Sequence, residues 1–92
     1  MLPAKVAQKG ANKLGKKVAQ QYVDENPARA PATYQVDPCS RKTDHRFSCK
    51  LHVYGTDSDT GQSYDCHAYI VVQASKSNYT YTTKLTGRQP CD

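Results

Sequence analysis

The residues of this chain whose chemistry is easiest to predict are its four cysteines, which can form disulfide bonds. They are Cys39, Cys49, Cys66 and Cys91. The chain has 92 residues with no Trp and one Phe, so it can bury only a small apolar core. An even number of cysteines in such a chain predicts two disulfide bonds, each worth about 2–4 kcal/mol. Disulfides form in oxidising compartments, so we expect a secreted or extracytoplasmic protein. The first ten residues contain no apolar run typical of a signal peptide, so we expect any leader to have been removed.

Histidine and carboxylate side chains suggest a second kind of chemistry in one segment. His67 alternates with Ser63 and Asp65, and these are the residue types of a catalytic triad. Neighbours two apart on a strand stand about 6.5–7 Å from each other, beyond the roughly 3 Å that a nucleophile and its base require. The sequence also contains no glycine-rich phosphate loop, paired-carboxylate cleft or cofactor motif. We therefore expect a protein that is not an enzyme and has no cofactor.

The first element that must position these residues is a helix over residues 1–26. Small and apolar side chains recur there at helical spacing, and five lysines fall on the opposite side. The apolar stripe consists of Ala4, Ala7, Ala11, Leu14, Val18 and Tyr22, and the lysines are Lys5, Lys9, Lys13, Lys16 and Lys17. Asn26-Pro27 ends the helix, while Gly10 and Gly15 each weaken it by about 1 kcal/mol. Such a helix needs a surface to pack on, and its alanine-rich stripe suits close approach to a sheet.

The rest of the chain predicts a sheet. Residues 27–33 form a stiff, proline-containing connector, and residues 34–92 hold the sheet and a C-terminal tail. Alternating polar and apolar residues predict strands near Tyr34–Asp37, Arg46–Tyr54, Ser63–Gln73 and Asn78–Thr86. Turns are expected at Ser40–His45, Gly55–Gln62 and Ala74–Ser77. One helix followed by four sequential strands predicts a single α+β domain, with the helix packed on a four-stranded antiparallel meander.

The register of the central hairpin decides which cysteines can bond. A four-residue loop that ends at Gly61 sets the apolar side chains of both strands on one face. Cys49 and Cys66 then stand roughly 13 Å apart along the ladder, whereas disulfide-bonded Cα atoms are at most about 7 Å apart. Cys39 lies just across the preceding turn from Cys49, and Cys91 follows the last strand, whose Leu85 is expected beside Cys66. We therefore predict the pairs Cys39–Cys49 and Cys66–Cys91, one of three possible pairings.

The last strand is expected to extend the same core face. Pairing Val72 with Tyr79 across the preceding turn adds Tyr79, Tyr81, Thr83 and Leu85 to that face. This register also sets Leu85 beside Cys66. The helix stripe should cover the resulting apolar surface.

The register places His52 directly opposite His67 on the other, solvent-facing side of the sheet. Two imidazoles with Cβ atoms about 5 Å apart could share a divalent metal, or repel each other when both are protonated. Two ligands alone make a weak site, so two half-exposed imidazoles without a metal are the expectation here.

The solvent-facing side of the sheet is the candidate binding surface. Its tyrosine, histidine and lysine side chains could contact an extracellular protein or a carbohydrate, and they are Lys50, His52, Tyr54, His67, Tyr69 and Lys84. The Gly55–Gln62 loop, acidic through Asp57 and Asp59, is a second candidate contact. The same residues also suit an ordinary solvated sheet face, since Thr and Tyr favour strands. We interpret the chain as a binding or inhibitor-type module without catalytic activity.

The basic helix face supports an alternative function. The net charge is +5, and residues 1–29 hold most of the excess. A row of lysines can contact anionic lipid or nucleic acid. However, the opposite face is mostly alanine, which is too shallow for firm membrane insertion, and no aromatic side chains stand among the lysines to stack on bases. Asn78-Tyr79-Thr80 also matches a glycosylation sequon.

The order of one helix followed by an antiparallel sheet resembles the cystatin arrangement, in which a sheet wraps one long helix. The resemblance is architectural and covers most of the chain. The inhibitory motif of cystatins, Gln-x-Val-x-Gly, is absent, and IVVQAS at residues 70–75 departs from it. Inhibition of cysteine proteases is therefore not carried over to this chain.

Overall fold

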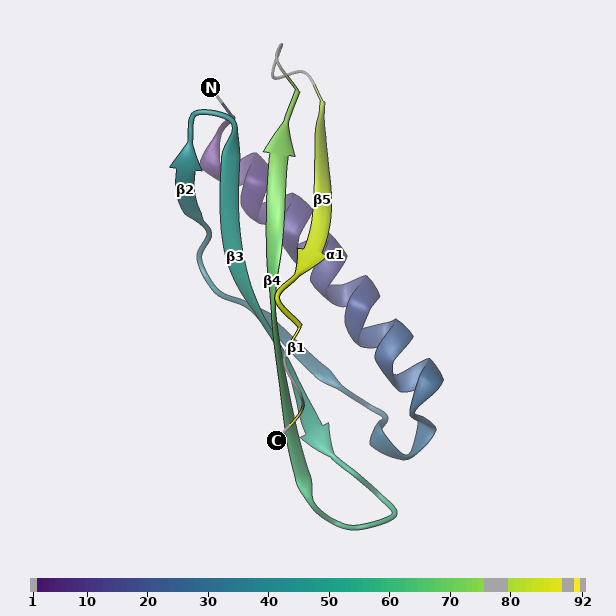
Figure 1. The fold of residues 1–92 in the computed structure, drawn as a ribbon. Coiled ribbons are helices and arrows are strands. Elements are labelled where there is room, and N and C mark those ends of the chain that lie inside the picture. The colour runs from purple at the N-terminus through teal and green to yellow at the C-terminus, as the bar shows by residue number, and fades with distance from the viewer. Residues whose placement is uncertain (1, 76–79, 89–90, 92) are drawn as a thin grey trace.

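A long helix lies across one face of an antiparallel sheet (Figure 1). The computed structural model describes residues 2–75, 80–88 and 91. Its elements are α1 (Ala4–Glu25), η1 (Pro27–Arg29), β1 (Thr33–Val36), β2 (Ser40–Thr43), β3 (Arg46–Thr56), β4 (Ser63–Ala74) and β5 (Tyr81–Thr86). The strand order is β1-β3-β4-β5, and β2 pairs with the first part of β3. This arrangement confirms the predicted α+β class.

The end of α1 follows from its local sequence. The backbone N–H and the side-chain amide of Asn26 both donate to the Tyr22 carbonyl oxygen at 2.9 Å. These two bonds satisfy a carbonyl that the helix itself leaves unpaired. Pro27 has no N–H to continue the ladder, and its ring disfavours a helical conformation at Asn26. The helix therefore stops one residue before the predicted end.

Two glycines let α1 approach the sheet closely. A Cβ atom at Gly15 would lie 2.8 Å from Val36 Cγ2 and 3.1 Å from Leu51 Cδ1. A Cβ atom at Gly10 would lie 2.6 Å from Tyr81 Cε1. Van der Waals contact between carbon atoms requires about 3.5–4.0 Å, so a side chain at either position requires the helix or the neighbouring side chain to move. The two glycines that weaken the helix by propensity thus lie where α1 approaches the sheet closely.

The β3–β4 hairpin has the predicted register. Phe47 is paired with Val72, and Cys49 is paired with Ile70. The Asp57 N–H donates to the Gln62 carbonyl at 2.8 Å and closes the loop. Gly61 has a φ of 73°, a left-handed conformation that glycine adopts without steric cost.

A fifth strand, β2, lies where the sequence predicted a turn. Ser40 pairs with Ser48 and Arg41 pairs with Phe47, so the turn is confined to Asp44 and His45. All four residues of β2 are exposed, and no apolar alternation distinguishes them from a polar turn. The prediction of a four-stranded meander is therefore wrong by one strand, because β3 is long enough to pair with two short segments along one edge.

The register of β5 also differs from the prediction. Val72 pairs with Thr83 instead of Tyr79, and Leu85 lies opposite Ile70 rather than Cys66. The turn predicted at Ala74–Ser77 is too short. Beyond the last β4–β5 pair, Ala74↔Tyr81, the Ser75 N–H donates to the Thr80 carbonyl oxygen at 2.8 Å, so the connection starts later than expected. A shift by an even number of residues leaves each side chain on its expected face. Residues 78 and 79, the expected start of this strand, lie outside the described residues.

The core lies between α1 and the inner sides of β3 and β4. Its largest fully buried side chains are Phe47, Leu2, Leu51, Ile70, Val72 and Cys49. The helix contributes small residues, with Ala7 and Ala11 both 0% exposed. No pattern predicted the burial of Leu2, whose backbone is held by a bond to the Asp44 carbonyl and one from the Arg41 guanidinium.

Both predicted disulfides are confirmed. Cys39 bonds to Cys49 and Cys66 bonds to Cys91, with Cα separations of 4.3 Å and 4.2 Å. The first joins the segment between β1 and β2 to β3, and the second joins the chain after β5 to β4. Each bond therefore attaches one edge of the molecule to the central hairpin.

Candidate functional site

The face of the sheet that points away from α1, here called the outer face, collects the predicted binding residues. Side chains alternate along a strand, so the positions between the buried residues of β3 and β4 all point outward. Three cross-strand rows result, Lys50↔Tyr69, His52↔His67 and Tyr54↔Asp65. Lys84 lies on β5 opposite Val71 and forms the border of this group.

Two tyrosines give the outer face its apolar contact area. Tyr54 is 39% exposed and Tyr69 is 40% exposed. The chain leaving β5 passes beside Tyr69, because a Cβ atom at Gly87 would lie 3.1 Å from its Cδ2 atom. Gly87 has a φ of 63°, so this close passage needs a residue without a side chain. The Tyr69 ring is therefore covered on one side by the backbone at Gly87 and exposed to solvent on the other.

The predicted histidine pair forms the middle row of the outer face. The ring centroids of His52 and His67 lie 4.9 Å apart with an interplanar angle of 75°. This edge-to-face arrangement brings the two imidazoles into direct contact. Both side chains are half-buried, with 22% and 24% of their surface exposed, and are therefore less open to solvent than the sequence suggested.

Asp65 approaches His67 more closely than strand spacing alone predicts. Its Oδ1 atom lies 3.6 Å from His67 Nε2, although the two residues are two positions apart on β4. The spacing of about 6.5–7 Å describes their backbone positions, whereas the side chains lean toward each other. The structure therefore adds a carboxylate to the histidine pair.

A second carboxylate, from Asp37, holds His52 from the opposite side. Asp37 Oδ2 lies 3.2 Å from His52 Nε2, and Asp37 Oδ1 accepts a bond from Gln35 Nε2 at 3.1 Å. The bond to His52 and then the bond from Gln35 lower the pKa of Asp37. Sequence reasoning missed this contact, because it assigned no pairing register to the strand predicted near Tyr34–Asp37.

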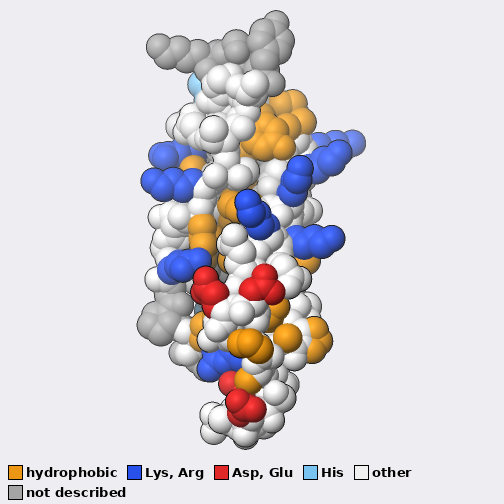
Figure 2. Space-filling view, turned by 90° about the vertical axis from the view of Figure 1, so that its right-hand side faces the viewer, with side chains coloured by type: hydrophobic (Ala, Val, Ile, Leu, Met, Phe, Trp, Pro, Cys, Tyr) orange, Lys and Arg blue, Asp and Glu red, His pale blue; other side chains and the backbone are white. Residues whose placement is uncertain are grey.

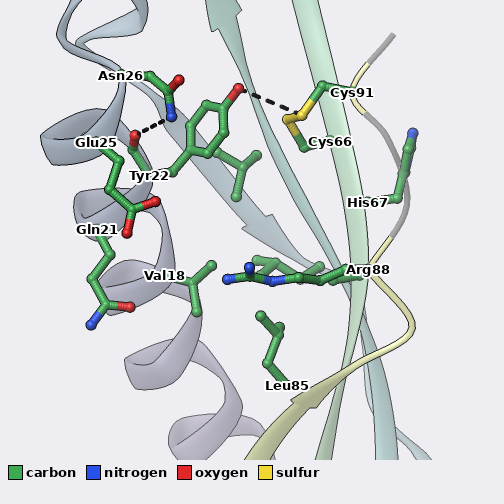
Figure 3. A pocket seen from close by; sticks show the side chains of 13 residues that line it. Val18, Gln21, Tyr22, Glu25, Asn26, Cys66, His67, Leu85, Arg88 and Cys91 are labelled. Atoms are coloured by element: carbon green, nitrogen blue, oxygen red, sulfur yellow. Dashed lines mark hydrogen bonds between the residues drawn. A yellow bond between two sulfur atoms is a disulfide. The ribbon is translucent and has the colours of Figure 1, made fainter.

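A pocket opens between the C-terminal half of α1 and the sheet (Figure 3). Its volume is about 270 Å³, and its apolar wall consists of Val18, Leu51, Val53, Ala68 and Leu85. The Cys66–Cys91 disulfide lines one side, where the Tyr22 hydroxyl lies 3.5 Å from Cys91 Sγ. The Arg88 side chain extends from the strand side toward α1. The volume is slightly below the range of about 300–1,000 Å³ typical of small-molecule sites.

Arg29 ties the end of α1 to the hairpin loop. Its guanidinium donates to the Tyr22 hydroxyl and to Asp57 Oδ2, and lies 5.0 Å from the centroid of the Tyr64 ring. The Tyr64 hydroxyl in turn donates to the Arg29 carbonyl. The bonds to Tyr22 and Asp57 raise the pKa of Arg29, and burial raises the pKa of Tyr64.

The sequence analysis predicted Asp57 to be part of an acidic contact surface. In the structure its side chain forms hydrogen bonds within its own loop. Its Oδ1 atom accepts bonds from the backbone N–H groups of Asp59 and Thr60 at 2.9 Å and 3.3 Å. The Asp59 N–H, and after it the Arg29 guanidinium, lower the pKa of Asp57. The exposed acid of the loop is Asp59.

The five helix lysines are exposed on the side of α1 that faces solvent. Figure 2 shows basic side chains spread over the upper part of this side of the molecule, with acidic side chains gathered below them. In the described part of the chain, no carboxylate lies within ion-pair distance of these lysines. None of the described helices has the apolar length needed to cross a membrane.

Comparison with known proteins does not assign a family. The chain matches no family model, no curated protein and no solved structure with significance. The architectural resemblance to cystatins stays an expectation from the sequence.

Proposed function

We propose that this protein is a non-catalytic binding module that contacts an extracellular protein or carbohydrate through its outer face. The observation that supports the proposal is the convergence of Lys50, His52, Tyr54, His67 and Tyr69 on three adjacent cross-strand rows. Tyrosine, histidine and lysine together offer apolar area, hydrogen-bond donors and positive charge. A partner with a flat surface and acidic or hydroxyl groups fits this composition.

Rigidity favours binding through this surface. The two central strands pair from Arg46↔Gln73 to Thr56↔Ser63, and a disulfide attaches each of them to another segment of the chain. Side chains on such a frame lose little conformational freedom when they are covered, so more of the contact energy remains as affinity. Tyrosine adds area with only two side-chain torsions to restrict.

The proposal includes export from the cytoplasm. Two disulfides in a chain with so small a core are typical of secreted domains, because oxidising compartments preserve such bonds. Intact-mass measurement of protein isolated under non-reducing conditions tests this part. Recovery of the chain from its native source with four free thiols would contradict export.

The outer face is tested by comparing two double substitutions of equal chemistry. Y54S/Y69S removes two tyrosines from the outer face, whereas Y34S/Y81S removes two of nearly equal exposure, 38% and 39%, from the helix side of the sheet. Immobilised protein and both variants are exposed to extracellular fluid from the native source and to a glycan array. We expect bound partners to be retained by Y34S/Y81S and lost by Y54S/Y69S, with native disulfides in both. Equal binding by the two variants would contradict the proposal.

The exposed lysines of α1 support a second candidate, binding to an anionic surface. Contacts of this kind weaken steeply with salt, because binding releases counterions. A salt titration of binding to heparin, duplex DNA and anionic vesicles tests it, with K9Q/K13Q/K16Q as the matched variant. Absence of association at low ionic strength would eliminate this candidate and leave the outer face unaffected.

A further inference from the structure

The outer face contains two histidines and one aspartate whose donor atoms converge on one point. One ring nitrogen each from His52 and His67 and a carboxylate oxygen of Asp65 all lie within 4.8 Å of one another. The residues come from two paired strands that the Tyr54↔Asp65 and His52↔His67 rows hold in register. Backbone pairing therefore preorganises the three side chains.

The distances between the donor atoms suit a small divalent ion. Two ligands of a tetrahedral zinc ion, each about 2.0–2.1 Å from the metal, stand about 3.3–3.4 Å apart. His67 Nε2 and Asp65 Oδ1 are 3.6 Å apart, which is too long for a hydrogen bond and close to this ligand separation. The His52 nitrogen lies at most 4.8 Å from the other two donor atoms, so it needs to move inward by at most about 1.5 Å.

Two side-chain atoms of these three residues lack hydrogen-bond partners within the described part of the chain. Asp65 Oδ1 and His67 Nδ1 are buried, and neither is hydrogen-bonded to another atom of the described residues. Buried polar atoms are satisfied in the great majority of folded proteins, so each exception requires an explanation. A cation between Asp65 and the histidines would supply the partner that the carboxylate oxygen lacks.

Asp37 restrains the orientation of the His52 ring. It lies 3.2 Å from His52 Nε2, and an Nε2–H bond to this carboxylate leaves Nδ1 with the free lone pair. Histidines that bind metals usually donate their other ring N–H to such an acceptor, which fixes the tautomer and raises the basicity of the ligand. In such an arrangement His52 would donate Nε2–H to Asp37 and would bind a metal ion through Nδ1.

The donor set narrows the choice of metal. All four cysteines are held in disulfides, so no thiolate takes part. Two imidazoles and one carboxylate suit zinc, which is bound by nitrogen and oxygen donors, and they do not suit calcium or magnesium, which prefer oxygen ligands alone.

We propose that His52, His67 and Asp65 bind one zinc ion on the outer face, with Asp37 positioning His52. Three protein ligands leave a fourth coordination position for water or for a donor atom of a bound molecule. The inference concerns the isolated chain and does not depend on the identity of a partner. Failure to bind zinc would leave the proposed binding surface untouched.

The experiment is a zinc titration of the oxidised, untagged protein, followed by calorimetry and by the nitrogen chemical shifts of the imidazole rings. We expect binding of one zinc ion per chain, with shifts at His52 and His67 and none at His45. H52Q, H67Q and D65N should each weaken zinc affinity at least tenfold. H45Q is the matched control, since His45 lies in the turn before β3, roughly 23 Å from His52 at the rise of a strand, and its substitution should leave affinity unchanged.

A further variant and a second metal make the result specific. D37N should weaken zinc affinity by about 10- to 100-fold without abolishing binding, because Asp37 acts through His52. Magnesium at the same concentration should produce no ring shifts. Zinc binding that persists in both H52Q and H67Q would overturn the proposal, as would the absence of binding at millimolar zinc. If H67Q fails to fold, D65N with native disulfides and unchanged zinc affinity would overturn it equally.

Discussion

The close approach of α1 to the sheet predicts that the same substitution will have opposite effects at its two glycines. Replacing either glycine by alanine should gain about 1 kcal/mol of helix propensity, since both lie inside the helix. At Gly15 the new methyl group would lie 2.8 Å from Val36 Cγ2 and 3.1 Å from Leu51 Cδ1. Val36 is β-branched and stiff at its first torsion, and Leu51 is 1% exposed, so neither can move aside easily. Overpacking of this kind costs about 1–3 kcal/mol.

At Gly10 the neighbour can yield. The nearest atoms belong to the ring of Tyr81, whose side chain is 39% exposed and can rotate toward solvent. Because the gain in propensity is common to both variants, the difference between their unfolding free energies isolates the steric term. We expect G15A to be less stable than G10A by about 1–3 kcal/mol.

Urea denaturation followed by circular dichroism measures this difference, provided that the m-values agree. V36A offers an internal check, because it removes the group that the methyl group introduced by G15A would strike. In the G15A background V36A should destabilise the fold less than it does in the wild type, with a coupling of about 1 kcal/mol. Equal stability of G15A and G10A, or additive effects of G15A and V36A, would refute the reasoning.

Three other predictions concern the cross-links, the loop and the buried tyrosine. Loop-closure entropy predicts that removing the Cys39–Cys49 bond costs about 2.7 kcal/mol and removing the Cys66–Cys91 bond about 3.5 kcal/mol, given their separations of 10 and 25 residues. Chemical denaturation of C39A/C49A and C66A/C91A checks this order. If C39A/C49A loses more stability than C66A/C91A, the lost packing of the buried Cys49 side chain contributes more than the entropy of loop closure. D57N should destabilise the protein at neutral pH. Because the pKa of Asp57 is lowered in the folded state below its ordinary value of 3.8, its contribution is present above that value and disappears as the pH falls through the folded pKa. The stability difference between D57N and wild type should therefore shrink in acid, with D59N as the control, and a difference that does not change with pH would contradict the assignment. Y64F should cost about 1–2 kcal/mol, because it leaves the Arg29 carbonyl without the bond from the Tyr64 hydroxyl; an unchanged denaturation midpoint would contradict this role.

Part of the candidate site could be derived from the sequence. The opposition of His52 and His67 follows from the hairpin register, which depends on an alternating apolar pattern and on a loop that ends in glycine. The convergence of Lys50, Tyr54 and Tyr69 on the same face follows from the same register. The approach of Asp65 and Asp37 could not be derived, because backbone spacing does not determine how side chains lean.

The sequence by itself determined the helix, the central hairpin and the pairing of the cysteines. These features depend on local periodicity, on turn residues and on the parity of positions along a strand, all of which can be read without knowing the rest of the fold. Only the tertiary structure decided that Ser40–Thr43 is a strand, that β5 shifts by four residues from the expected pairing, and that Leu2 closes the core. Each of these depends on contact with a distant part of the chain. The polar segment Ser40–Thr43 forms a strand because the long strand β3 has unpaired backbone groups along that edge. Leu2 is buried because the fold brings it against the core formed by distant residues.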